Sequence, residues 1–290
     1  MNLNFKEYYI KLPNSIYDDL DIANDELTIL ILLYRNYQQY KNISLCNIQI
    51  LLDIMNINYH NNKKIFNDIK DIIANLMKKE YVTSIYDLSG NGINENIIID
   101  NIIKSKDTSF YIELPSPPED GYFKIYDLEM NKIFEYLQST NVSKYDFVRY
   151  FVACMRVCNT DNKFGYLPQI KIKSLVSDSR TIKRYNRILQ DDLHLIRFNN
   201  DYLTPQHHYC ATFIGLYDDE KGFNEQLKNV VKVQGLIHTD KIVSNKKRSI
   251  KQKINNNEKI KGLEEENKKL KEKLNELQYK QEKEFYKDED

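Results

Sequence analysis

The feature that most constrains the fold is an order of helices and strands that occurs twice along the chain. In the first occurrence, Asp25–Tyr37 is predicted to be a buried helix capped by Asn24, and Ser44–Met55 a shorter helix that begins at a Ser cap. Asn62–Lys79 is predicted to be an amphipathic helix, because its apolar residues recur at helical spacing. These residues are Ile65, Phe66, Ile69, Ile72, Ile73 and Leu76.

Two β-rich runs follow these helices. Tyr81–Tyr86 and Ile97–Ile103 flank the segment Ser89-Gly-Asn-Gly92. Gly and Asn tolerate the backbone conformations of tight turns, so the pattern predicts a β-hairpin. The first region therefore contains three helices and a hairpin.

The second region has the same order. Ser143–Cys158 is predicted to be a helix with a weak capping box, Pro168–Val176 a short helix, and Ser179–Leu195 an amphipathic helix. Leu195–Phe198 and Tyr202–Thr204 then flank a short polar turn and predict a tight hairpin.

Matching elements of the two regions begin at similar separations. The pairs Asp25 and Ser143, Asn62 and Ser179, and Glu80 and Leu195 are 118, 117 and 115 residues apart. We interpret this as duplication of one unit; the alternative is two unrelated helical domains of similar size. Three helices followed by a hairpin is the order of a winged helix. The predicted fold is mainly α with small β-hairpin wings (α+β): two tandem winged-helix domains followed by a C-terminal coiled-coil helix.

Changes in composition indicate the domain boundaries. Three prolines in Pro115-Ser-Pro-Pro-Glu-Asp-Gly121 interrupt regular structure, and the chain becomes strongly polar after about residue 240. We predict a first winged helix in residues 1–114, a linker in 115–124, a second winged helix in 125–217, a polar and basic linker in 218–255 and a coiled coil in 256–286.

The coiled-coil prediction rests on a heptad pattern between residues 256 and 281. Apolar residues recur in steps of three and four, with Glu and Lys between them. Asn267 falls at an a-type position, where Asn favours a parallel dimer in register. The alternative is a single solvated helix. The residues predicted to form a homodimer or higher oligomer are Leu263, Asn267, Leu270, Leu274 and Leu277.

The amphipathic helices are the candidate DNA-binding elements, because the third helix of a winged helix enters the major groove. Lys+Arg and Asp+Glu both number 42, so binding to double-stranded DNA requires local basic patches. Asn can recognise adenine, and Lys can reach phosphate or guanine. The candidates on the first helix are Asn62, Lys63, Lys64, Asn67 and Lys70, beside Asp68 and Asp71.

The second amphipathic helix is richer in cations. Four of them recur at spacings of three and four, which places them on one helix face. Hydroxyls at the start of the helix can hold a phosphate. The alternative is a solvated face. The predicted DNA-binding residues are Ser179, Arg180, Thr181, Lys183, Arg184, Tyr185 and Arg187.

A third basic patch, Lys246, Lys247 and Arg248, precedes the heptads. A basic helix that continues into a zipper would resemble a bZIP protein. The Asn255-Asn-Asn257 interruption favours instead a flexible linker that binds phosphate.

Other chemistry has weaker signals. Cys154, Cys158, His207, His208 and Cys210 contain enough ligands for zinc, but a Cys pair on an apolar helix is more often buried core. We predict no metal site and no cofactor. Motifs for phosphate loops, dinucleotide binding and hydrolase nucleophiles are absent from the sequence, so we predict that the protein is not an enzyme.

No apolar run approaches the ~18–20 residues of a membrane span. The first residues lack an apolar signal core, and four Cys make no disulfide framework. We therefore expect a reduced, cytoplasmic protein without a membrane partner.

Residues 5–37, with Tyr9-Ile-Lys-Leu-Pro-Asn14 and the Leu-rich helix that follows, resemble the N-terminal winged helices of replication initiators and DnaD-like replisome organisers. Those proteins come from plasmids and phages of low-GC Gram-positive bacteria. The resemblance implies binding to origin repeats and recruitment of a host helicase or its loader. The alternatives are a transcriptional or partition regulator with the same modules, and a protein–protein adaptor that does not bind DNA.

Overall fold

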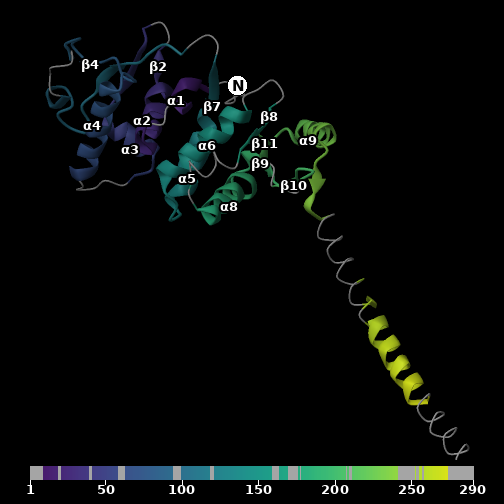
Figure 1. Cartoon of the computed structure of the whole chain (residues 1–290). Helices are drawn as coiled ribbons and strands as arrows, with labels where there is room; N and C mark the ends of the chain where they lie inside the picture. The colour runs from purple at the N-terminus through teal and green to yellow at the C-terminus, as the bar shows by residue number, and fades with distance from the viewer. Residues whose placement is uncertain are drawn as a thin grey trace, which may run out of the picture. The chain divides into compact units, whose positions relative to one another are not determined.

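The computed structural model contains helices and small antiparallel sheets, which confirms an α+β fold (Figure 1). The structure describes residues 9–18, 21–38, 41–57, 63–93, 99–117, 121–158, 163–168, 176, 178–206, 208, 211–240, 252, 255–256 and 258–273. Contacts divide the chain into two units. The first contains Met1–Asn200 and Tyr209–Gln234, and the second contains Asp201–His208 and Gly235–Asp290.

The first half of the large unit ends at β6. In chain order it contains β1 (Tyr9–Pro13), α1 (Asn14–Asp18), α2 (Asn24–Arg35), β2 (Tyr37–Gln38), β3 (Ile43–Cys46), α3 (Ile48–Ile54), α4 (Lys63–Lys78), β4 (Ser84–Asp87), β5 (Gly92–Ile93), the 3-10 helix η2 (Ile99–Asn101) and β6 (Phe110–Glu113). The predicted helices Asp25–Tyr37 and Asn62–Lys79 are present as α2 and α4. Their apolar faces are buried because the apolar spacing matches the helical repeat.

Strand β6 lies in the middle of the first sheet, which has the order β2-β3-β6-β4-β5. All its pairs are antiparallel, and Ser44, Ile112 and Ile85 stand side by side on its buried face. The predicted hairpin is present in part. Strands β4 and β5 pair around a turn in which the Asp87 carboxylate accepts backbone N–H groups of Ser89 and Asn91 at 2.8 and 2.9 Å.

The second arm of that hairpin was predicted wrongly. Residues 99–101 form the 3-10 helix η2, and the strand that crosses the sheet is β6. The helix predicted to begin at Ser44 begins at Ile48 instead. Ser44 lies in β3, and the side chain of Asn47 caps α3 by accepting the N–H of Ile50 at 2.7 Å. The predicted Asn24 cap is also displaced: Ala23 is the N-cap of α2, and the Glu26 carboxylate accepts the Ala23 N–H at 2.8 Å.

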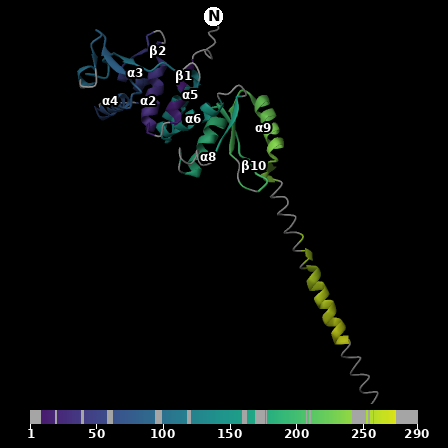
Figure 2. The same ribbon diagram turned by 45° about the horizontal axis from the view of Figure 1, so that its top comes forward.

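The second half of the large unit also combines helices with a small antiparallel sheet. In chain order it contains β7 (Tyr122–Tyr126), α5 (Asp127–Gln138), α6 (Lys144–Cys158), β8 (Phe164–Leu167), α8 (Ser179–Arg187), the π-helix η3 (Ile188–Asp192), β9 (Ile196–Asn199), β11 (Thr212–Leu216) and α9 (Glu220–Gln234). The sheet has the order β8-β11-β9. Its last strand in the sequence, β11, lies between β8 and β9, as β6 lies between β3 and β4 in the first sheet. Helix α9 packs on this sheet (Figure 2).

The second predicted hairpin is wrong. Strand β9 pairs with β11, whereas Tyr202–Leu203 (β10) pairs with Ile237–His238 (β12). The reason is burial. Four of the five residues of β11 are buried, and the strand forms hydrogen bonds with neighbours on both edges, which two half-buried residues of β10 cannot match.

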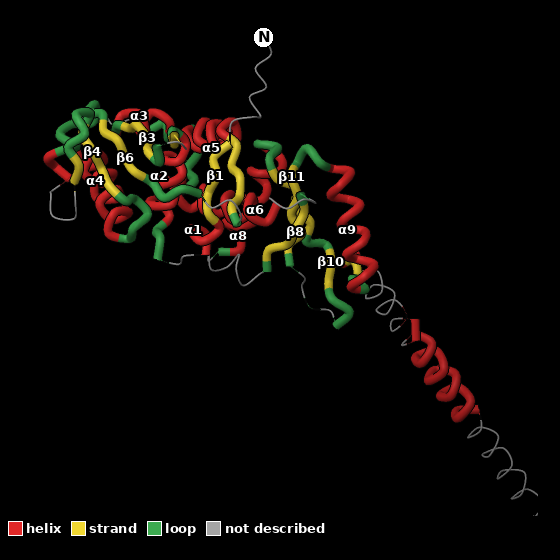
Figure 3. Tube along the Cα trace, turned by 90° about the horizontal axis from the view of Figure 1, so that it is seen from above, coloured by secondary structure: helices red, strands yellow, loops and turns green. Residues whose placement is uncertain are grey.

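The two halves of the large unit share one hydrophobic core. Strand β1 pairs with β7 across the two halves, and α2 packs against α6 (Figure 3). Polar contacts reinforce this packing. Asn24 donates to Asp146 at 2.6 Å, Arg35 donates to Asp127 at 2.8 Å, and buried Arg149 donates to the Ile22 carbonyl oxygen at 2.7 Å. The segment predicted as a linker takes part: residues 122–124 belong to β7, and the Pro115 carbonyl oxygen accepts the Tyr34 hydroxyl at 2.9 Å.

Three further comparisons complete the fold. The predicted helix Ser143–Cys158 is present as α6, and the Asp146 N–H donates to the Ser143 hydroxyl at 3.5 Å. Helices α5 and α9 were not predicted, and α9 occupies part of the predicted polar linker 218–255. Residues 169–175 of the predicted helix Pro168–Val176 lie outside the described residues.

The smaller unit contains the β10–β12 pair and a helix over residues 258–273. The Thr239 N–H donates to the Asp201 carbonyl oxygen at 2.8 Å and extends that pairing. In the part of the chain that the structure describes, no helix has both the length and the apolar character needed to cross a bilayer.

Candidate nucleic-acid interface

Helix α8 is fixed at its start by a side-chain cap. The Asp178 carboxylate accepts the backbone N–H groups of Arg180 and Thr181 at 3.2 and 3.3 Å, and the Thr181 hydroxyl at 3.1 Å. The bond from the Arg180 N–H contributes most to a lowered pKa of Asp178, which keeps the carboxylate charged as a cap. The Thr181 hydroxyl, predicted to contact phosphate, is therefore already bonded, whereas Ser179 is exposed.

One face of α8 is anchored in the core. Tyr185 is 3% exposed, and its ring packs against those of Phe147 and Tyr150 at centroid distances of 5.1 and 5.6 Å. The prediction that Tyr185 contacts DNA is wrong, because its ring is enclosed by protein. Tyr150 also donates its hydroxyl to the Asn186 side chain at 2.5 Å, which orients the next residue.

The opposite face of α8 carries the four predicted cations. Arg180, Lys183, Arg184 and Arg187 are all exposed, and the Arg180 side chain is 92% exposed. Arg180 lies 3.7 Å from the Asp178 carboxylate, a weak surface ion pair. Among the residues that the structure describes, the other three form no ion pair. The face is therefore a cluster of solvated positive charges, of which only Arg180 has an ion-pair partner among the described residues.

A π-helical turn ends this basic face. In η3, Asp192 accepts the Tyr136 hydroxyl at 2.5 Å, and this hydrogen bond is the main reason that the pKa of Tyr136 is raised. Ile188 and Leu189 are buried beneath the turn. The contact of Tyr136 with Asp192 ties the end of the helix to α5, so both ends of the basic face are held by the protein.

Helix α4 presents a different surface. Lys70 forms an ion pair with Asp100, its ammonium lies 5.2 Å from the Phe66 ring centroid, and its side chain is only 14% exposed. Lys70 was predicted to contact DNA, and this ion pair partly neutralises its charge. Lys64 and Asn67 are exposed, but so are the acidic residues Asp68 and Asp71. Asn62 and the side chain of Lys63 lie outside the described residues.

Two other predicted groups are described only in part. Lys246, Lys247 and Arg248 lie outside the described residues, as do Leu274 and Leu277. On the helix over residues 258–273, Leu263 and Leu270 are 55% and 58% exposed, and Asn267 is exposed between them.

Two cysteines of the zinc site considered in the sequence, Cys154 and Cys158, are buried in α6. Burial raises the pKa of the Cys154 thiol well above its usual value and that of Cys158 to about 12, which disfavours the thiolate that a metal needs. His207 and Cys210 lie outside the described residues. Within the described part, no cluster of three His, Cys, Asp or Glu side chains is arranged to hold a metal.

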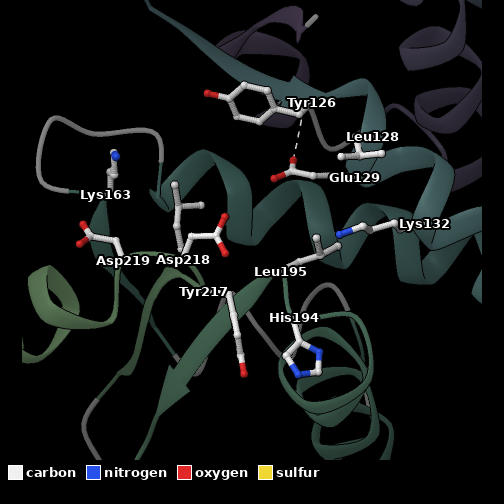
Figure 4. Close-up of a pocket in the computed structure, with 11 residues that line it drawn as sticks. Tyr126, Leu128, Glu129, Lys132, Lys163, His194, Leu195, Tyr217, Asp218 and Asp219 are labelled. Carbon is white, nitrogen blue, oxygen red and sulfur yellow. Dashed lines mark hydrogen bonds between the residues drawn. The ribbon is translucent and has the colours of Figure 1, made fainter. Parts of the chain in front are cut away.

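A pocket of about 360 Å³ lies beside α5 and β11 (Figure 4). It has an apolar wall with His194 and Tyr217, and three carboxylates: Glu129, Asp218 and Asp219. Two of the carboxylates support helix starts. Glu129 accepts the Tyr126 N–H at 3.3 Å, and Asp219 accepts the Gly222 N–H at 3.2 Å. No sequence pattern predicted this pocket, because its residues come from four separate segments.

No protein-family model matches the chain, and no curated protein matches it at a significant level.

Substitutions on the buried and exposed faces of α8 should differ strongly in their effect on the free energy of unfolding. Tyr185→Ala should lower the free energy of unfolding by about 3 kcal/mol, because it removes a buried aromatic ring. Arg184→Ala, one position away, should change it by less than about 0.5 kcal/mol, because the side chain is solvated. Urea denaturation followed by circular dichroism measures both. Equal effects of the two substitutions would contradict this assignment of faces.

Proposed function

We propose that the protein binds double-stranded DNA sequence-specifically through two winged-helix units. The support is topological. In each half one strand (β3 or β8) comes before a helix (α4 or α8), and two strands of the same sheet follow that helix. The last of these strands lies between the other two, as in β3-β6-β4 and β8-β11-β9. A winged helix has this order, with the third helix toward the major groove and the hairpin toward the backbone or minor groove.

The observation that carries the DNA proposal is the solvated basic face of α8. An α-helix fits the major groove, where Arg can bind guanine with two hydrogen bonds and Lys or Arg can pair with phosphates. Four exposed cations on one helix, only one of which has a carboxylate partner among the described residues, favour a polyanionic partner. Tyr185 supports them from the core side by fixing the position of the helix.

The first unit has a smaller role in this proposal. Its helix α4 offers Lys64 and Asn67, but Lys70 is neutralised by Asp100, and Asp68 and Asp71 would repel phosphates. This surface favours contact with a protein over contact with DNA. The exposed acidic residues of α4 also support the second candidate function, a protein–protein adaptor.

The C-terminal helix supports dimerisation through a parallel coiled coil. With Asn267 at position a, the exposed residues Ile260, Leu263 and Leu270 occupy a and d positions. In a parallel, in-register pair, g and e′ residues of the two copies meet. Two such pairs then have opposite charge, Lys259 with Glu264 and Glu266 with Lys271. Exposed apolar residues and complementary flanking charges favour a second copy of this chain.

The more specific form of the proposal is a replication initiator in the cytoplasm. It rests on the resemblance of residues 5–37 to winged helices of plasmid and phage initiators. In this form α8 binds origin repeats, the coiled coil joins protomers, and the acidic surface of α4 contacts a host helicase or its loader. A transcriptional or partition regulator would use the same DNA contacts.

Removal of the basic face tests the DNA proposal. The variant with Arg180→Ala, Arg184→Ala and Arg187→Ala should bind duplex DNA more weakly, and the slope of log K against log salt should decrease by about 2.7, because about 0.9 is lost for each phosphate contact. The matched control replaces three exposed lysines of α9, Lys221, Lys228 and Lys232, by Ala. Fluorescence anisotropy measures both. Unchanged affinity and slope in the α8 variant would refute the role of this face.

Footprinting on the DNA that flanks the gene separates the three functions. An initiator should protect several spaced direct repeats, because each protomer reads one site. A regulator should protect its promoter alone, and an adaptor should protect nothing. The α8 variant should lose whatever protection the wild-type protein gives.

The coiled-coil proposal has its own test. Leu263→Lys with Leu270→Lys should convert a dimer to a monomer, because each chain would bring two charges into the apolar interface. Glu265→Gln with Glu272→Gln adds the same net charge at f positions, which face solvent, and should leave the dimer intact. Analytical ultracentrifugation measures the mass of each. A monomeric wild-type protein, or a dimer that survives the leucine substitutions, would exclude this interface.

A further inference from the structure

The ribbon formed by β1 and β7 has one buried face and one outer face, on which Tyr9 is exposed and the other side chains are half-buried. Ile10, Leu12, Phe123 and Ile125 point into the core and are at most 4% exposed. The other face carries three tyrosines and two lysines: Tyr9, Lys11, Tyr122, Lys124 and Tyr126. This outer face contains no acidic residue, and the tyrosine and lysine side chains alternate along each strand.

The outer face is two-fold symmetric in its two Tyr-x-Lys segments, whereas Pro13 stands at the position equivalent to Tyr126. Both strands contain a Tyr-x-Lys sequence, and the antiparallel register places Lys11 directly opposite Lys124. The contacts are reciprocal. The Lys11 ammonium lies 4.7 Å from the centroid of the Tyr122 ring, and the Lys124 ammonium lies 4.4 Å from that of Tyr9. A local pseudo-two-fold axis therefore passes between the two lysines and relates the two Tyr-x-Lys segments.

Like charges directly opposite each other destabilise a strand pair. Neither lysine forms an ion pair with any residue that the structure describes. Each ammonium is instead held over an aromatic ring, which fixes its position and lowers the entropy lost when it binds an anion. Two fixed ammonium groups without a carboxylate suit the phosphates of a ligand.

The tyrosines narrow the class of this ligand. Tyr9 is 39% exposed and meets Tyr126 edge to face at 6.2 Å. Aromatic side chains beside cations on a flat strand surface bind unpaired bases by stacking, whereas the bases of a duplex are already stacked on one another. Stable binding of a duplex uses many phosphate contacts, and two lysines can supply only a few of them.

The ribbon and α8 lie on different sides of the large unit. Figures 1 and 2 both draw α8 below the level of the β1–β7 pair, and Figure 3, seen from above, shows β1 in front. A duplex on the basic face of α8 would leave the ribbon uncovered. The ribbon is therefore a surface separate from the basic face of α8.

We propose that the outer face of the β1–β7 ribbon binds single-stranded nucleic acid, with phosphates on Lys11 and Lys124 and a base against Tyr9. The proposal does not require α8 to bind duplex DNA. The pseudo-two-fold axis makes the two lysines equivalent, so Lys11→Gln and Lys124→Gln should weaken binding to a similar extent.

Fluorescence anisotropy with oligo(dT) and oligo(rU) of ~12 nucleotides tests this, a length in the range of known single-strand sites. The double variant Lys11→Gln and Lys124→Gln should bind at least one oligonucleotide about tenfold more weakly. Its salt slope should decrease by about 1.4, because single strands lose about 0.7 for each contact. Tyr9→Leu should weaken binding and leave the slope unchanged. Tighter binding of oligo(dT) or of oligo(rU) identifies the physiological ligand as DNA or RNA.

Two controls separate this proposal from duplex binding. Lys228→Gln with Lys232→Gln removes the same charge from α9 and should leave oligonucleotide binding intact. The α8 variant should keep oligonucleotide binding, and the ribbon variant should keep duplex binding. The proposal is overturned if the wild-type protein binds neither oligonucleotide. It is also overturned if the double lysine variant binds the oligonucleotides like the wild type. A third contrary result is a lower melting temperature of this variant with unchanged binding by the molecules that remain folded, because the lysines would then have only a structural role.

Discussion

The antiparallel pairing of β1 with β7 is the interaction on which the rest of the structure depends. It joins strands 113 residues apart in sequence, and its buried face closes the core over the packed helices α2 and α6. Pairing of this kind is entropically expensive, so it requires the apolar burial that Leu12, Phe123 and Ile125 supply. The positions of the helices that face solvent, α4 and α8, follow from this shared core.

Local patterns predicted the strongly amphipathic or apolar helices α2, α4 and α6, missed α5 and α9, and predicted strand pairing poorly. The apolar spacing in Lys63–Lys78 and Lys144–Cys158 marks a helix face without any knowledge of its partner. Strand β11 lacks such a pattern because four of its five residues are buried on both faces of the sheet. Tyr202–Leu203 is nearer to β9 in sequence, so local spacing favoured it as the partner of β9. Strand pairing between distant segments, as in β1 with β7, leaves no local signal.

The candidate site shows the same division between local and distant information. The exposed cations of α8 could be predicted, because spacings of three and four residues place them on one face. The core role of Tyr185 had a signal that was missed, since it lies three residues from both Ile182 and Ile188 on the apolar face. The pairing of Lys70 with Asp100 has no sequence signal, because the two residues are 30 positions apart and the fold alone brings them together. The repeated Tyr-x-Lys at Tyr9 and Tyr122 was visible but gains meaning only from the strand register.

The two halves of the large unit differ in the charge that their solvent-facing helices expose. The two halves share strand order and a two-fold ribbon, yet α8 exposes four cations, whereas α4 exposes Asp68 and Asp71 and has Lys70 paired with Asp100. Core residues constrain both halves to the same plan, while solvent-facing positions are free to diverge because they cost little stability. Duplex binding by α8 alone would make recognition of a DNA site asymmetric within one protomer. A symmetric site would then require a second copy, which the heptads between residues 258 and 273 are suited to recruit.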